Sequence, residues 1–176
     1  MKIDKNFFSR DAEIVARELL GKVIVRKKGD REFRALIVET EAYFDEKDPA
    51  SRACKNGDLK ETMKKEAAII LVYGVHNNWM MNFVTGKQGE AEAVLLRALE
   101  PLNFKERASG PGLLTRALKI DKSLHGKEFG NEVWLEYKKE NKEELEIERS
   151  FRIGVKKDLK RKLRFYVKGN CFVSRK

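Results

Sequence analysis

The sequence predicts a single domain of the α+β class, in which short strands outnumber helices and mostly connect to their neighbours in sequence. The chain has 176 residues, which suits one domain. Hydrophobic residues make up 41 %, enough for a core at this length. Both signs of charge and ten Phe along the chain argue against disorder. No repeat or linker divides it, so residues 1–176 are treated as one domain.

Two helices are expected. Ser9 is the candidate N-cap of the first helix, which ends at Gly21 and carries apolar residues at helical spacing: Ile14, Val15, Leu19 and Leu20. The second opens at Ser109-Gly110-Pro111-Gly112 and continues through Leu118. The polar stretch 45–62 lacks periodicity and is predicted to be a loop.

Strands are expected where apolar residues alternate or form short runs between turn residues. These strands are 23–26, 33–43, 67–73 and 93–99, with short ones around Trp134, Ile147 and Phe165. Turns are expected at 27–31, at Gly74 and at 83–89.

The overall charge favours a polyanionic partner. Lys and Arg exceed Asp and Glu by 38 to 28, a net charge of +10. The last 21 residues hold nine basic residues against Asp158 alone, interrupted by aromatic side chains. This pattern fits nucleic-acid binding, and it also fits the solvated face of a lysine-rich protein.

Other classes of protein are disfavoured. No apolar run approaches the roughly 18 residues of a membrane span, so no membrane association is expected. The N-terminus has charges where a signal peptide needs apolar residues, and we expect a cytoplasmic protein with reduced Cys54 and Cys171. His76 and His125 have no metal-ligand spacing, so no zinc site is expected.

The strand 33–43 places carboxylates where core is expected. By alternation, Glu39, Glu41 and Tyr43 share a face with Phe33, Ala35 and Ile37. A buried, unpaired carboxylate is costly. Either these groups pair with a buried cation, for which Arg97 is the candidate, or one is a general base beside a substrate.

The segment 73–82 joins a strand to a turn that carries an aromatic residue, followed by Trp79, Met80, Met81 and Asn82. Tyr73 could wedge between bases, as apolar side chains do in kinked DNA, or simply pack at the end of a hairpin.

Several motifs then occur in a characteristic order. They are Val-Glu-Thr-Glu-Ala-Tyr (38–43), Asp-Pro-Ala-Ser (48–51), Val-Tyr-Gly (72–74), Val-Leu-Leu-Arg-Ala-Leu-Glu-Pro (94–101), Ser-Gly-Pro (109–111) and Leu-Arg-Phe-Tyr-Val (163–167). The series covers nearly the whole chain and resembles the 3-methyladenine (alkylpurine) DNA glycosylases of the alkyladenine glycosylase family. We therefore expect a largely antiparallel, curved sheet flanked by helices, with a protruding hairpin that intercalates into DNA.

The resemblance implies roles for individual residues. Glu41 would activate the attacking water, and Arg97 would help to hold that carboxylate and water. Tyr43 would stack on the extruded base, and Tyr73 would fill the hole left in the duplex. Asn82 would line the base pocket and disfavour the guanine amino group.

The chemistry agrees with these roles. A base must be flipped out of the duplex to be reached, and this is cheapest for a damaged base. One carboxylate can both stabilise an oxocarbenium-like sugar and take a proton from water. We expect a monofunctional hydrolase that needs no metal and no cofactor, acts as a monomer on double-stranded DNA containing damaged purines, and leaves an abasic site. Its expected substrates are 3-methyladenine and 7-methylguanine, with hypoxanthine and ethenoadenine as further candidates.

The chain departs from the family pattern at two places in the expected base pocket. Arg52 follows the Asp-Pro-Ala-Ser segment where the family usually has His, and Ile70 stands where it often has Tyr. Arg52 can stack, but it repels a cationic base. The segment from Tyr73 to Asn82 is also longer by two residues, with Asn77-Asn78 as the expected insertion.

Phosphate contacts are assigned to the basic C-terminal region and to the start of the second helix. The predicted residues are Lys156, Lys157, Lys160, Arg161, Lys162, Ser109 and Gly110.

Two other functions remain open. One is a non-catalytic nucleic-acid or damage-binding protein. The other is a metal-dependent nuclease that uses Glu39, Glu41, Asp45 and Asp48.

Overall fold

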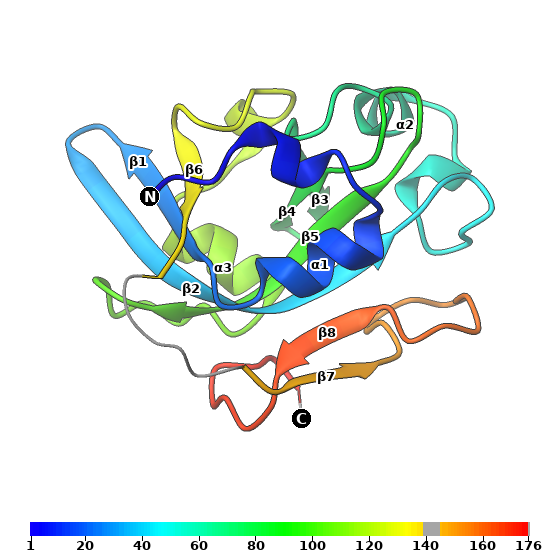
Figure 1. The fold of residues 1–176 in the computed structure, drawn as a ribbon. Coiled ribbons are helices and arrows are strands. Elements are labelled where there is room, and N and C mark those ends of the chain that lie inside the picture. Colours follow the sequence, from blue (N-terminus) through cyan, green and yellow to red (C-terminus); the bar gives the residue numbers. More distant parts are fainter. Residues whose placement is uncertain (139–144, 176) are drawn as a thin grey trace.

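The protein is an α+β domain built on a curled, antiparallel sheet with few helices, as the sequence predicts (Figure 1). The computed structural model describes residues 1–138 and 145–175. The strand order is β3-β4-β5-β2-β1-β6; β8 adds to β2, and β7 pairs with β8. Every pairing between these strands is antiparallel; β1–β2, β3–β4, β4–β5 and β7–β8 join consecutive strands, whereas β2–β5, β2–β8 and β1–β6 join strands far apart in sequence.

The elements have the following bounds. The α-helices are α1 (Ala12–Leu19), α2 (Asp58–Met63) and α3 (Pro111–Ala117), with 3₁₀ turns at Lys5–Phe8, Arg52–Cys54 and Lys122–Leu124. The strands are β1 (Val23–Lys28), β2 (Arg31–Tyr43), β3 (Ile70–Val75), β4 (Asn78–Val84), β5 (Ala93–Pro101), β6 (Val133–Glu136), β7 (Ile147–Ser150) and β8 (Arg164–Val167).

Strand β2 is the centre of the sheet. One edge pairs with β5 along nearly its whole length. The other edge pairs first with β1 and then, at Glu39–Glu41, with β8. The C-terminal half of β2 is therefore enclosed on both edges, and Glu39, Thr40 and Glu41 are all fully buried.

Helix α1 covers one face of this half of β2. Thr40 Oγ1 donates a hydrogen bond of 2.8 Å to the Ala16 carbonyl of the helix. The predicted N-cap, Ser9, is wrong: Asp11 caps the helix, because its carboxylate accepts from the N–H groups of Glu13 and Ile14. Ser9 instead ends the preceding 3₁₀ turn.

Strands β3 and β4 form a hairpin whose turn lies at His76-Asn77, two residues beyond the predicted Gly74. Both residues have positive φ, 45° and 60°, as a two-residue hairpin turn of the I′ type requires. Gly74 is part of β3 and lies opposite Trp79. The start of α3 packs on the hairpin so closely that a Cβ at Gly112 would lie 2.7 Å from the Asn78 side chain.

The predicted loop 45–62 contains more structure than its polar sequence suggests. It includes a 3₁₀ turn capped by Ser51 and most of α2. Helix α2 is held against β3 by His125, which accepts from the Val72 N–H at 3.1 Å and lies 3.0 Å from Asp58. These contacts come from distant residues, which is why local periodicity does not reveal them.

Neither cysteine is paired: Cys54 and Cys171 are free and exposed. None of the helices that the structure describes has both the length and the apolar character needed to span a bilayer.

Candidate active site

Glu39 is fully buried and its carboxylate is saturated with partners. Oε1 accepts from Arg97 Nε at 3.1 Å and from Arg164 Nε at 2.8 Å. The Ser174 N–H donates to Oε2 at 2.6 Å, and its hydroxyl donates to Oε1 at 2.8 Å. Two guanidinium groups and two further donors leave this carboxylate no role but a structural one.

Glu41 is equally buried but is held mainly by neutral donors. The Ile153 N–H donates to Oε1 at 2.7 Å, and the Tyr43 hydroxyl donates to Oε2 at 2.7 Å. The guanidinium of Arg97 lies 3.5 Å away. Burial raises the pKa of Glu41 above its ordinary value of 4.5, and Arg97 and the two hydrogen bonds offset only part of this rise. A raised pKa makes this carboxylate a stronger base than an exposed glutamate, which suits it to accept a proton.

Arg97 bridges the two carboxylates from strand β5. The pairing of β2 with β5 is irregular there, because its register shifts between Ile37 and Glu39 and again between Glu39 and Thr40. Such bulges re-aim side chains. The guanidinium contacts Glu39 through Nε and Glu41 through a terminal nitrogen. Both explanations left open by the sequence therefore apply: Glu39 is the ion-pair partner, and Glu41 has the features of a base.

Arg152 is a residue of this site that the sequence did not reveal. Its side chain is fully buried and binds both oxygens of Asp48, at 2.6 and 2.7 Å, and the Ala42 carbonyl at 3.0 Å. It also pairs with Asp158. Burial alone would raise the pKa of Asp48, but the hydrogen bonds from Arg152 and from backbone N–H groups outweigh burial and hold the pKa below 3.8.

The same guanidinium lies over the ring of Tyr43, with Cζ 4.5 Å from the ring centroid. Arg152 therefore covers one face of the predicted base-stacking residue, and its neighbour Ile153 holds Glu41. In the sequence, the one sign of this role is that Arg152 stands alone as a charged residue between the apolar residues Phe151 and Ile153.

A small cavity adjoins these groups. It has a volume of about 10 Å³, near the smallest space that can hold one water molecule. Its lining joins four of the five residues predicted for base recognition and intercalation with three apolar ones: Tyr43, Arg52, Tyr73, Asn82, Met63, Leu71 and Ala93.

Tyr73 occupies this region because its position on β3 directs it toward the cavity rather than toward the tip of the hairpin. Arg52 covers its ring, with Cζ 4.7 Å from the centroid. Burial raises the pKa of the Tyr73 hydroxyl above 10, partly offset by Arg52 and by a hydrogen bond with Asn82. Asn82 is buried and donates to the Leu71 carbonyl at 3.3 Å.

Ile70 lies elsewhere, contrary to its predicted place in the pocket. It is fully buried in the main core, together with Val72. The next residue, Leu71, packs with Tyr73 on the opposite side and lines the cavity. Residues three apart on a strand point to opposite faces, so Ile70 cannot share the orientation of Tyr73.

The predicted phosphate-binding residues fall in two places. All five of the basic residues are exposed on the loop between β7 and β8, which also carries Arg152 and Ile153. Arg161 pairs with Glu13 at 2.6 Å, whereas none of the four lysines forms an ion pair with any residue that the structure describes. Gly110 is the N-cap of α3 and Ser109 precedes it, beside the β3–β4 hairpin.

The metal-dependent nuclease alternative requires the acidic residues of β2 and of the loop after it to bind a metal ion, and the structure does not gather them in this way. Glu39 is bound by two arginines and Asp48 by Arg152. Within residues 1–138 and 145–175, no three His, Cys, Asp or Glu side chains gather in an arrangement that could hold a metal ion.

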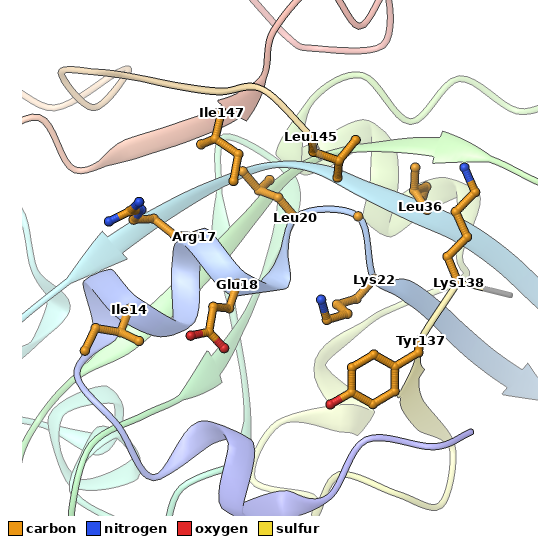
Figure 2. Close-up of a pocket in the computed structure, with 11 residues that line it drawn as sticks. Ile14, Arg17, Glu18, Leu20, Lys22, Leu36, Tyr137, Lys138, Leu145 and Ile147 are labelled. Carbon is orange, nitrogen blue, oxygen red and sulfur yellow. The ribbon is translucent and has the colours of Figure 1, made fainter. Parts of the chain in front are cut away.

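A larger cavity of about 590 Å³ lies outside helix α1 (Figure 2). Figure 2 shows Lys22 and Tyr137 on one side of it, and around it apolar side chains from α1 and the residue after it, from β2, and from β7 and the segment before it: Ile14, Leu20, Leu36, Ile147 and Leu145. None of the residues predicted for catalysis or base recognition lines it. Volume alone therefore does not mark the catalytic centre.

Comparison with known proteins identifies the family to which the chain belongs. The model of the methylpurine-DNA glycosylase family matches residues 6–171. A protein of Aeropyrum pernix is 42 % identical over 98 % of this chain and 93 % of its own length. One from Legionella pneumophila is 37 % identical (99 % and 98 %), and one from Clostridium tetani is 34 % identical over the whole of both chains. All three bear the name "Putative 3-methyladenine DNA glycosylase". The chain thus belongs to the methylpurine-DNA glycosylase family and is a DNA glycosylase.

Proposed function

We propose that this enzyme removes alkylated purines from duplex DNA by hydrolysing the N-glycosidic bond with a water molecule activated by Glu41. The observation that carries the proposal is the contrast between two neighbouring carboxylates. Glu39 is saturated by two guanidinium groups, whereas Glu41 is held by two neutral donors and one more distant guanidinium, with its pKa raised by burial.

In this reaction the water oxygen bonds to C1′ of the sugar as the bond from C1′ to the base nitrogen breaks. The electron pair of that bond stays on the base and neutralises the positive charge of an alkylated purine. One proton of the water passes to Glu41. The carboxylate also stabilises positive charge that develops on the sugar. Arg97 keeps Glu41 ionised and oriented.

Admission of the base requires a rearrangement, because a purine does not fit into about 10 Å³. Tyr73 leaves the cavity and enters the duplex at the position of the extruded nucleotide. The base then takes the space that the Tyr73 ring occupies in the free protein, against Tyr43 and beside Asn82. The observation that supports this proposal is the place of the Tyr73 ring in the lining of a cavity too small for a base.

The lysines at 156, 157, 160 and 162 bind phosphates on the side of the site where Ile153 contacts Glu41. Arg161, Ser109 and Gly110 are proposed to complete the backbone contacts. The enzyme acts as a monomer, and in the cytoplasm, at the nucleoid if the cell is prokaryotic. It needs neither metal nor cofactor.

The test is release of free base from methylated duplex DNA in excess chelator by the wild type and by Glu41→Gln. We expect release by the wild type and a loss of at least about a hundredfold in the variant, the lower range for removal of a general base. Equal rates would overturn the role of Glu41. Binding of damaged DNA without release would instead indicate a damage-binding protein.

A further inference from the structure

Three features near the base pocket bear on which damaged bases the enzyme accepts. They are the position of Arg52 over Tyr73, the position of Arg152 over Tyr43, and the difference in ion pairing between these two arginines.

The ring of Tyr73 marks where a flat aromatic group rests in the pocket. Arg52 covers that ring at 4.7 Å, and both residues line the cavity together with Tyr43 and Asn82. When a purine replaces the phenol ring, the guanidinium of Arg52 is already placed to stack on it.

The charge of Arg52 is not neutralised locally. Arg97, Arg152 and Arg164 each pair with a buried or partly buried carboxylate. Arg52 has no such partner among the residues that the structure describes. Arg52 is exposed in the free protein, so solvent screens its charge there, and the charge acts fully on a group in the pocket only once bound DNA excludes that solvent.

Tyr43 compensates for this charge only weakly. An aromatic face normally attracts a cationic base, but one face of Tyr43 is already covered by the Arg152 guanidinium at 4.5 Å. The two rings of the pocket are therefore each in contact with an arginine before any base enters.

We propose that Arg52 is a specificity-determining residue that makes the pocket favour neutral damaged purines, such as hypoxanthine, over positively charged ones. This inference rests on the proposed base-excision function and names the substrate class that the same site prefers.

The effect of Arg52 differs between the two classes in both the bound state and the transition state. A cationic base is repelled on entry, and it leaves as a neutral molecule that gains nothing from a nearby cation. A neutral base leaves with the electron pair of the broken bond, and the resulting negative charge is stabilised by Arg52 until the base takes a proton from water.

The experiment measures single-turnover release of hypoxanthine and of 7-methylguanine from duplexes of identical sequence. The intrinsic stability of the two glycosidic bonds differs, so the informative quantity is how each variant changes the ratio of the two rates. Arg52→Gln removes the charge, and Arg52→Lys keeps the charge without the planar group. Arg31→Gln is the matched control, because Arg31 stacks on Phe33 at 4.6 Å but lies outside the pocket.

We expect Arg52→Gln to lower the ratio of hypoxanthine to 7-methylguanine release by at least about tenfold, the effect of one partly desolvated cation–π contact. Arg52→Lys should lower it less, and Arg31→Gln should leave it unchanged. Equal changes for both bases in Arg52→Gln would overturn the role of Arg52 and leave the proposed function intact. Release of neither base by the wild type would overturn both.

Discussion

The hydroxyl of Tyr43 donates a hydrogen bond of 2.7 Å to Glu41 Oε2, two residues earlier on the same strand. Alternation places both side chains on one face of β2. The ring proposed to hold the base and the carboxylate proposed to activate water therefore orient each other. A shift of the base would be transmitted to Glu41 through a single contact.

This contact predicts the pH dependence of base release. Glu41 must be ionised to accept a proton, so the rate falls as the pH falls through its pKa. Burial raises that pKa above 4.5, and the Tyr43 hydroxyl lowers it in part. We expect a wild-type acid limb above pH 4.5, moved to higher pH in Tyr43→Phe. Single-turnover rates measured across this pH range give the acid limb of each protein. If the limb lies at the same pH in both, the titrating group is not Glu41.

Glu39 and Glu41 should differ in their effect on stability. Glu39→Gln leaves Arg97 and Arg164 without their shared charge partner and should lower the free energy of unfolding by about 3–5 kcal/mol. The folded-state pKa of Glu41 is raised, so its contribution to stability is present below pH 4.5 and is lost as the pH rises. Glu41→Gln should therefore unfold at pH 7 no more readily than the wild type. Denaturant titrations of the two variants give the comparison, and equal destabilisation would contradict the division of roles.

Arg152→Met should destabilise the protein at neutral pH, because it leaves Asp48 charged and buried without its partner. We expect a loss of about 3–5 kcal/mol at pH 7. The folded-state pKa of Asp48 is lowered, so the stability it contributes is present above pH 3.8 and is lost below. The difference in free energy of unfolding between the variant and the wild type should accordingly become smaller as the pH falls. If this difference stayed constant down to about pH 3, the stability lost in the variant would come from side-chain packing rather than from charge.

Tyr73→Ala should impair release from paired DNA more than from unpaired DNA. If Tyr73 stabilises the extruded state, its loss matters most where a base pair must be broken. We expect a fall of at least about tenfold for a lesion in duplex and a smaller one for the same lesion in a single strand. The ratio of these rates is the readout, with Tyr73→Phe as the control that keeps the ring. The same loss on both substrates would argue against intercalation.

The four lysines of the β7–β8 loop predict strongly salt-dependent binding. Affinity for duplex DNA should fall steeply between about 50 and 200 mM salt, as counterion release requires. Replacing Lys156 by Gln should reduce the slope of log affinity against log salt by about one. A titration series at several salt concentrations measures the slope. The result would contradict the assignment if the slope were the same in both proteins.

The sequence predicted those parts of the site that depend on local pattern. Alternation in β2 brought Glu39, Glu41 and Tyr43 together, and the apolar strand 93–99 supplied Arg97 as their cation. The error at Ser9 arose because two capping residues, Ser9 and Asp11, precede the same helix, and only the geometry distinguishes them.

Contacts between distant segments could not be predicted in this way. Arg152 meets Asp48 across 104 positions, and Ser174 meets Glu39 across 135. No periodicity links such residues. The place predicted for Ile70 came from the family resemblance alone, and in this structure Ile70 lies in the main core, on the face of β3 opposite to Tyr73.

Because these contacts join residues far apart in sequence, they affect when the enzyme becomes active during folding. The Ile153 N–H, the Arg164 guanidinium and the Ser174 hydroxyl all come from the C-terminal part of the chain, from the β7–β8 loop onward. Pairings so distant in sequence form late. A partly folded chain would already expose its lysines to DNA, but Glu41 would have only the Tyr43 hydroxyl and would still lack the Ile153 N–H, the second of its two donors. Such an intermediate would bind DNA without creating abasic sites, so that an immature repair enzyme would not damage the DNA to which it is bound.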